Sequence, residues 1–344
     1  MKEVIFYQSN GISVDNFEDI TASFYIQENI GQQLFNSRFF YNGDSINYEL
    51  EKVCVDLYDL FTEKVFTNMD DYYRYIKYLP LIIIKAGLDS DYNFSKDEFQ
   101  QAVEGDLFGN ILNSQNHEIL KDIFKSLNKN KYKYLYLSDC QSLINSIQEL
   151  LQTCMSNFIF FYKLLCEIEG PRDFCDDYYN ISTEGRIVIS TASNIFISLY
   201  SIFDIITKLA YELENIKECD DNYPKLASRK ILFGDKKDLK LTNIKGTIFE
   251  KNGTISIVEN LRNELVHNAV WEMNSKIFFH LKKGNIVDKT IYFPDFSDEG
   301  HLVTYKNRKR FFSNGIKLNE ELPILYFETL QRIKITLERL IEEG

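Results

Sequence analysis

Residues 259–268 read ENLRNELVHN, and the prediction of both fold and function depends on this stretch. A helix that begins near Gly253 would gather its apolar residues on one face, at Val258, Leu261, Leu265 and Ala269. Glu259, Asn263 and His267 are spaced by four, so they form a separate polar row on the same helix. The stretch therefore predicts an amphipathic helix with one buried stripe and one polar row.

Arg262 lies beside this polar row, so the helix presents a guanidinium, an amide and an imidazole together. These groups suit RNA cleavage in which the ribose 2′-hydroxyl attacks the neighbouring phosphate. An imidazole can take or give the proton near neutral pH, and a guanidinium matches the phosphate oxygens. An amide can position the phosphate or the imidazole. The candidate catalytic residues are therefore Arg262, Asn263 and His267, and no metal is needed because the nucleophile belongs to the substrate.

The sequence around this helix has helical periodicity over most of the second half of the chain. Ser138 and Gln141 predict a capping box, followed by a long helix that ends at Gly170-Pro171. Further long helices are expected over 184–216 and 318–343, and the first has its apolar stripe at Phe196, Leu199, Phe203, Ile206 and Ala210. Between these helices, alternating segments at 276–281 and 286–293 predict a β-hairpin that turns at 283–285.

The first half of the chain has a less regular pattern. Val4 to Tyr7 reads as a strand and 39–43 as an extended piece, and helices are expected at 46–66, 70–85, 95–105 and 117–128. The polar, lysine-rich stretch 128–134 suggests a boundary. We therefore expect a mostly helical N-terminal regulatory or docking region over 1–135. A mainly α antiparallel helical bundle with a small β-hairpin insert is expected over 136–344.

The pattern Arg262-Asn263, followed after three residues by His267, resembles the arginine–polar–histidine motif of the HEPN superfamily. This resemblance covers roughly residues 136–344 and implies a helical bundle with the motif on a late helix. It also implies a metal-independent endoribonuclease with no cofactor. Members of this family act as homodimers, so Arg262 and His267 of two copies would form one composite active site.

Many proteins of this family are toxins or antiphage effectors, so the resemblance implies RNA, including tRNA, as substrate. An antitoxin or another defence-system protein is the partner it implies. Some HEPN toxins carry a tyrosine two residues after the motif histidine, which a partner enzyme modifies. This chain has Ala269 there, so neutralisation by that route is not expected. The alternative function is a non-catalytic HEPN-like module that binds RNA, nucleotides or another protein.

Charge and cysteine content limit where and how this protein would work. Its formal net charge is −12, so RNA would have to bind at a local basic patch on an acidic body. The six cysteines show no metal-ligand spacing, and free buried thiols such as Cys154 and Cys166 fit a reducing cytosol. The longest apolar run, 158–165, contains a lysine and is too short to span a membrane. A cytoplasmic protein with no membrane contact is expected.

A basic run near the C-terminus is the second candidate site. Lys306, Arg308, Lys309 and Arg310 could hold the RNA backbone. Phe311 or Phe312 could stack on a base, although aromatic residues at such a junction also commonly enter a core. The lysine-rich insert 225–246 could bind phosphates or form a solvated loop face.

Two alternatives concern the motif, and a third concerns a possible metal site elsewhere. His267 could be a structural histidine, with Arg262 paired to Glu259. Asp204 could orient His267 or could find another polar partner in the bundle. The stretch 89–100 begins like a calcium loop, but it has phenylalanine at the sixth position and glutamine at the twelfth, so no metal site is expected there.

Overall fold

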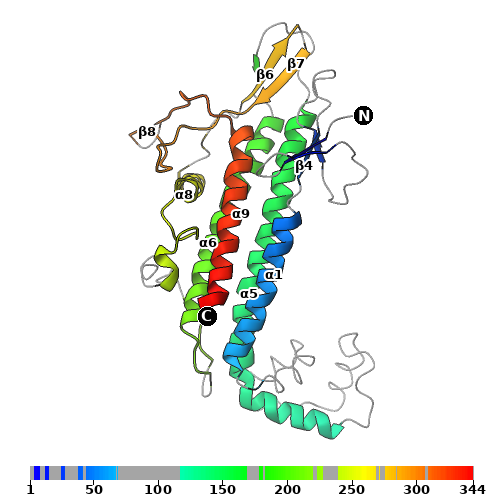
Figure 1. Cartoon of the computed structure of the whole chain (residues 1–344), viewed down its shortest axis with the longest axis vertical. Coiled ribbons are helices and arrows are strands. Elements are labelled where there is room, and N and C mark those ends of the chain that lie inside the picture. Colours follow the sequence, from blue (N-terminus) through cyan, green and yellow to red (C-terminus); the bar gives the residue numbers. More distant parts are fainter. Residues whose placement is uncertain are drawn as a thin grey trace. The chain divides into compact units, whose positions relative to one another are not determined.

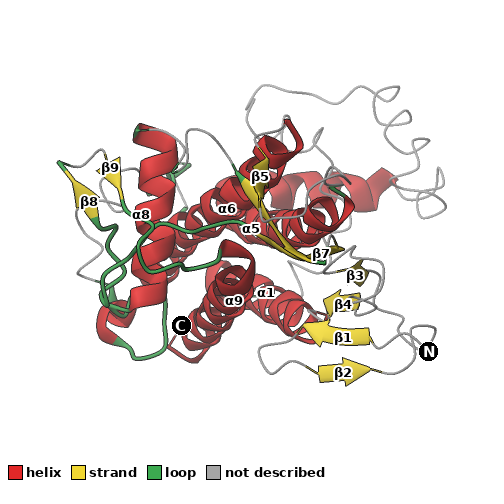
Figure 2. Cartoon of the chain, turned by 90° about the horizontal axis from the view of Figure 1, so that it is seen from above, coloured by secondary structure: helices red, strands yellow, loops and turns green. Residues whose placement is uncertain are grey.

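The protein is mainly helical in this computed structural model, shown in Figures 1 and 2. The structure describes residues 4–7, 12–14, 25–27, 38–41, 44–66, 68, 117–168, 178–180, 183–219, 223–227, 239–268, 271, 276–283, 285–306 and 309–343. The chain divides into two compact units, each made from several segments. The first unit contains residues 1–54, 146–206 and 240–339, and the second contains 55–145, 207–239 and 340–344.

The core of the first unit is formed by parts of four helices: α1 (Asp44–Val65), α5 (His117–Glu167), α6 (Thr183–Glu214) and α9 (Leu318–Glu343). The predicted apolar stripe on α6 is buried, as its period of three to four residues requires. On α5, Phe158 stacks on Tyr326 of α9 with 4.7 Å between ring centroids. Tyr162 donates a hydrogen bond of 2.8 Å to the carbonyl of Asn319.

The second unit is organised around a buried carboxylate. Glu212 is fully buried and accepts a hydrogen bond of 2.8 Å from the Tyr136 hydroxyl. Lys217 supplies the compensating charge, with its Nζ 3.0 Å from Oε1 of Glu212. Burial raises the pKa of Tyr136, so this phenol remains a hydrogen-bond donor. The pair satisfies a charge that would otherwise be costly to bury.

Three small sheets accompany the helices in the described part of the chain. The first contains β1 (Val4–Tyr7), β2 (Ile12–Val14), β3 (Tyr25–Gln27) and β4 (Arg38–Tyr41) in the order β2-β1-β4-β3. Strand β1 and the extended piece at β4 were predicted, and they pair in parallel. The second contains β5 (Tyr178–Asn180), β6 (Ile277–Lys282) and β7 (Asn285–Thr290). The third pairs β8 (Thr304–Tyr305) with β9 (Lys309–Arg310).

The predicted hairpin at 276–293 is confirmed as β6 and β7, which pair antiparallel. Lys283 in its turn has a positive φ of 56°. Lys289 on β7 is 2% exposed, and its Nζ donates to the carbonyls of Leu165 and Ile168 at 3.0 and 2.6 Å. These carbonyls lie at the end of α5, where the helix has no backbone donors left. A buried ammonium therefore caps α5.

The predicted start of a helix at Ser138 is wrong. Helix α5 begins at His117 and continues through the lysine-rich stretch 128–134 without a break. The helix continues because it is packed: Tyr134 at the end of this stretch and Tyr136 just after it are 4% and 0% exposed. The expected helices at 70–85 and 95–105 and the rejected calcium loop at 89–100 lie outside the described residues. The regulatory or docking role of 1–135 stays a prediction.

The apolar content of α6 and the thiols agree with a packed interior. Among the described residues, α6 is the one helix long and apolar enough to cross a membrane, and 61% of its apolar window is buried inside the protein. Cys54, Cys140, Cys154 and Cys219 are buried and free of disulfides. Cys154 is thus confirmed as a buried thiol, whereas the side chain of Cys166 lies outside the described part.

Candidate functional site

Helix α8 (Gly253–His267) carries the predicted motif, and its first turn is capped by a side chain. Asn252 has extended backbone angles, and its side-chain oxygen accepts from the backbone N–H of Thr254 at 2.7 Å and of Ile255 at 3.4 Å. These bonds satisfy amides that have no partner inside the helix. The predicted start of the helix at Gly253 is confirmed.

One face of α8 is anchored to the rest of the first unit. Val258 and Leu261 are fully buried, and the Thr254 hydroxyl donates to Glu328 of α9 at 2.6 Å. Gly300 packs against the first turn of α8. With φ of +80°, it approaches so closely that a Cβ there would lie 2.3 Å from the carbonyl oxygen of Gly253. Only glycine fits this approach without moving the backbone.

The three candidate catalytic side chains meet at the end of α8. Nη1 of Arg262 donates to Oδ1 of Asn263 at 3.0 Å, and it lies 3.5 Å from Nε2 of His267. Arg262 and Asn263 are half-buried, whereas His267 is exposed. If Nε2 accepts this hydrogen bond, the proton of the neutral imidazole is on Nδ1. The helix thus gathers a cation, an amide and an imidazole at one solvent-facing point.

The ring of Tyr200 on α6 packs against the guanidinium of Arg262. The sequence did not predict this contact. Cζ of Arg262 lies 4.9 Å from the centroid of the Tyr200 ring, a cation–π contact. The hydroxyl of Tyr200 donates to Oε1 of Glu259 at 3.4 Å. Burial, together with the charges of Glu259 and Asp204, raises the pKa of Tyr200 to about 12. The phenol therefore stays protonated at neutral pH.

This arrangement decides one of the alternatives left open by the sequence. Arg262 forms no ion pair with Glu259, although both residues are in the described part. Glu259 instead accepts from Tyr200. The alternative in which Arg262 pairs with Glu259 is therefore wrong for this structure. The charge of Asp204 contributes to the raised pKa of Tyr200, and the interpretation that Asp204 orients His267 stays a prediction.

The basic run near the C-terminus divides into inward and outward residues. Arg310 forms an ion pair with Glu264 of α8, and its Nη1 donates to the carbonyl of Trp271 at 3.4 Å. Its side chain is 11% exposed, so it is not available to RNA in this arrangement. Lys306 and Lys309 are exposed, and their contact with phosphates stays a prediction. Arg308 lies outside the described residues.

His301 also lies beside α8. The side chain of Asn260 bonds to the carbonyls of Ser256 at 2.7 Å and Gly300 at 3.2 Å, and it lies 3.2 Å from Nδ1 of His301. His301 is exposed. This contact joins residues that are separated in the sequence by the β6–β7 hairpin.

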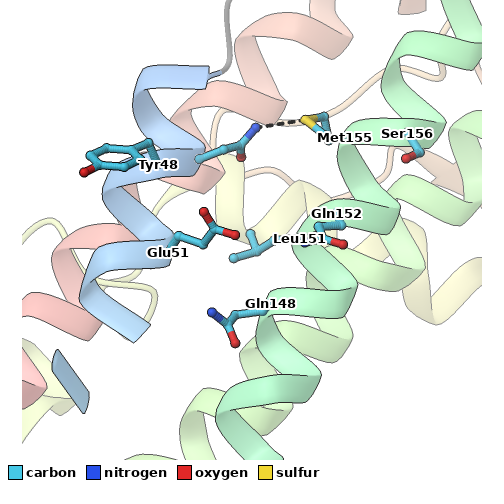
Figure 3. A pocket seen from close by; sticks show the side chains of 8 residues that line it. Tyr48, Glu51, Gln148, Leu151, Gln152, Met155 and Ser156 are labelled. Atoms are coloured by element: carbon cyan, nitrogen blue, oxygen red, sulfur yellow. Dashed lines mark hydrogen bonds between the residues drawn. The ribbon is translucent and has the colours of Figure 1, made fainter. Parts of the chain in front are cut away.

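A concave feature of the first unit lies away from these residues (Figure 3). It is a half-open groove of about 330 Å³ between α1 and α5. Its walls contain both polar and apolar surface and consist of Asn47, Tyr48, Glu51, Gln148, Leu151, Gln152, Met155 and Ser156. Asn47 donates to the sulfur of Met155 at 3.1 Å. None of the motif residues lines this groove.

Within the described part of the chain, no three His, Cys, Asp or Glu side chains gather as a metal site would require. No family model, curated protein or solved structure matches this chain. The geometry of α8 and its surroundings is therefore the main indication of function.

Proposed function

We propose that this protein is a metal-independent endoribonuclease of the HEPN type, acting as a toxin or an antiphage effector. The observation that carries this proposal is the 3.5 Å approach of Arg262 Nη1 to His267 Nε2 on the solvent-facing end of α8. A phosphodiester placed there could contact both side chains. The exposed imidazole and the supported guanidinium match the two needs of the reaction, proton transfer and charge stabilisation.

The reaction begins when the 2′-hydroxyl of the substrate loses its proton to a base and attacks the adjacent phosphorus. The P–O5′ bond breaks as the new P–O2′ bond forms, and the leaving 5′-oxygen takes a proton. The products are a 2′,3′-cyclic phosphate and a 5′-hydroxyl. His267 serves as base or acid, Arg262 stabilises the negative charge on the phosphoryl oxygens, and Asn263 holds Arg262 or the phosphate.

The 2′-hydroxyl must lose a proton while the leaving 5′-oxygen gains one, and one imidazole cannot be base and acid at the same time. The proposal therefore includes a second copy of the chain. His267 of two copies would then supply the base and the acid of one composite site. The end of α8 that carries the motif is accessible to a second copy, since Val266 is 50% exposed beside the exposed His267.

The decisive experiment incubates the purified full chain with total RNA or tRNA in excess EDTA and maps the new ends. Cleavage with 2′,3′-cyclic phosphate ends is expected from the wild type, and His267→Ala and Arg262→Ala should each abolish it. Arg339→Ala, which removes an exposed arginine of α9, is the matched control and should cleave normally. Circular dichroism verifies that all variants fold.

A non-catalytic RNA- or protein-binding module is the second candidate, and the net charge of −12 favours it because such a charge weakens general attraction of RNA. The same experiment separates the two functions. RNA binding without new ends supports the module. Cleavage that persists in both His267→Ala and Arg262→Ala rejects the mechanism proposed above.

A further inference from the structure

The short hairpin of β8 and β9 has two chemically different faces. Thr304 pairs with Arg310 and Tyr305 pairs with Lys309, so each pair lies on one side of the ribbon. Because strand side chains alternate, Val303 and Phe311 fall on the side of Tyr305 and Lys309. The exposures follow this alternation: Val303, Tyr305, Lys309 and Phe311 are exposed, whereas Thr304 and Arg310 are only partly so.

The inward face fixes the hairpin to the motif helix, which lies beside it in Figures 1 and 2. Arg310 forms its ion pair with Glu264, one helical turn before His267. Both side chains are nearly covered, at 11% and 15% exposure. The hairpin is therefore held next to the site that carries Arg262 and His267.

Asp295 holds the two flanks of the hairpin in place. Its carbonyl accepts from the N–H of Val303 at 2.9 Å, and its own N–H donates to the carbonyl of Phe311 at 2.8 Å. Its buried carboxylate accepts from the N–H groups of Ser313 and Asn314 at 2.8 and 3.0 Å. The outward face is thus presented by a backbone fixed at both ends, which lowers the entropy lost when a ligand binds.

The outward face combines exposed rings with uncompensated cations. Tyr305 and Phe311 are 57% and 42% exposed, and Val303 is 40% exposed. Lys309 lies directly across from Tyr305, and Nζ of Lys306 lies 5.5 Å from the Tyr305 ring. Within the described part of the chain, neither lysine has a carboxylate partner. Such apolar rings flanked by lysines match the bases and phosphates of a nucleic-acid strand.

We propose that this outward face is a base-stacking subsite for unpaired RNA, in which Tyr305 and Phe311 hold bases and Lys306 and Lys309 hold phosphates. The inference rests on the proposed function, since it places the subsite beside the cleavage motif. It also names the substrate class. Paired bases are stacked inside a duplex and offer no free faces, so the site selects single-stranded segments. Arg310 acts as an anchor of the hairpin rather than as a phosphate ligand.

The test measures binding without cleavage, using the full chain with His267→Ala. Fluorescence anisotropy gives the dissociation constants of a labelled oligouridine of about twelve nucleotides and of a blunt RNA duplex of the same length. Tyr305→Leu and Phe311→Leu remove the rings, and Tyr305→Phe restores one. Tyr48→Leu is the matched control because Tyr48 is 70% exposed on α1 and lies outside the hairpin. Lys309→Gln tests the phosphate contact through salt dependence.

Each leucine substitution should weaken binding of the single strand by about 5- to 100-fold, the range that loss of one stacked base produces. Tyr305→Phe should bind as the parent does, and Tyr48→Leu should have no effect. The duplex should bind more weakly than the single strand, and Lys309→Gln should lower the slope of log affinity against log salt by about one.

Three results would overturn the subsite: both leucine variants binding as tightly as the parent, Tyr48→Leu being equally damaging, or the duplex matching the single strand. Absence of any oligonucleotide binding would overturn it too and would favour a protein partner on this face. The nuclease proposal is judged separately. If the wild type never cleaves RNA but binds it in a Tyr305-dependent way, the subsite is supported and the nuclease proposal is rejected. If cleavage and binding are unchanged by substitution of Tyr305 and Phe311, the nuclease proposal stands and the subsite is rejected.

Discussion

The guanidinium of Arg262 lies over the ring of Tyr200, with 4.9 Å between Cζ and the ring centroid. This contact joins α8 to α6 and holds the long arginine side chain beside His267. An arginine stacked on a ring keeps its donor edge free for a phosphate, because the contact uses only its flat face. The position of this guanidinium therefore depends on a ring contributed by another helix.

Tyr200→Leu should lower kcat/KM for RNA cleavage by about 5- to 30-fold, the equivalent of about 1–2 kcal/mol of cation–π interaction. Tyr200→Phe keeps the ring and should retain most of the activity. Since the pKa of Tyr200 is about 12, neither substitution should alter the pH profile between 6 and 9. Initial rates on a defined RNA oligonucleotide test this prediction. Equal damage by Phe and Leu would show that the ring does not position Arg262.

Gly300→Ala should destabilise the first unit because the new Cβ would meet the backbone of α8 at 2.3 Å. Gly315→Ala is the matched control, since Gly315 also has a positive φ, 64°, but has nothing within 4 Å. Both variants pay for the backbone conformation, so their difference isolates the collision, at about 2 kcal/mol. Urea unfolding measures it. Equal stabilities would mean that the Gly300 loop can move away from α8 at no cost.

The pair Glu264–Arg310 should be worth more than the exposed ion pairs of this protein. Arg310→Met should lower the free energy of unfolding by about 3 kcal/mol, because it leaves a largely buried carboxylate without its cation. Glu264→Gln in the same background should restore part of the loss, and a double-mutant cycle gives the coupling. The pair Lys163–Glu167, about 60% exposed on both sides, should show no measurable coupling. Similar coupling in both cycles would contradict the anchoring role.

Lys289→Met should destabilise the first unit by about 2 kcal/mol. The substitution keeps the apolar stem but removes the ammonium that donates to the last carbonyls of α5 at 3.0 and 2.6 Å. Lys282→Met replaces an exposed lysine of β6 and should leave the unfolding midpoint unchanged. Chemical denaturation followed by circular dichroism compares the two. A Lys289→Met protein as stable as the wild type would show that water caps the helix equally well.

Stability should fall as the pH rises above about 9. Burial raises the pKa of the Cys54, Cys140 and Cys154 thiols to about 12, against 9.0 for a free thiol. Between these values the unfolded chain has lost the thiol protons while the folded chain keeps them, so the free energy of unfolding decreases with pH. From pH 8 to 9.5 the loss should be about 2 kcal/mol. The triple Cys→Ala variant should lose less, and an identical pH response in it would assign the effect elsewhere.

Local sequence patterns predicted the elements that carry the site, because the signals for these elements lie within a few neighbouring residues. The bounds of α6 and α9 were predicted to within two residues and the start of α8 at Gly253, while the β6–β7 hairpin follows from alternation around one turn. The cluster of Arg262, Asn263 and His267 follows from helical spacing alone. These relationships need no knowledge of what packs against the helix.

Contacts between distant segments were not accessible in this way. In the sequence, Tyr200 looks like another aromatic residue of a core helix. Its contact with Arg262 follows only from the packing of α8 against α6. Arg310 reads as part of a basic run, yet strand alternation and Glu264 turn it inward. The stretch 128–134 is polar apart from its tyrosines, and Tyr134 within it is buried. This burial stabilises α5 across the stretch. In each case the partner lies far away in the chain and no local signal identifies it.

The β8–β9 hairpin has strands of only two residues, and its anchoring side and its aromatic side differ by a single step along the chain. Adding or deleting one residue within a strand would exchange the two sides of that strand. In β8 the change would turn Tyr305 toward α8, and in β9 it would turn Arg310 into solvent and release Glu264. A length change of one residue would therefore remove either the aromatic surface or the anchor, whereas a two-residue change would spare both orientations.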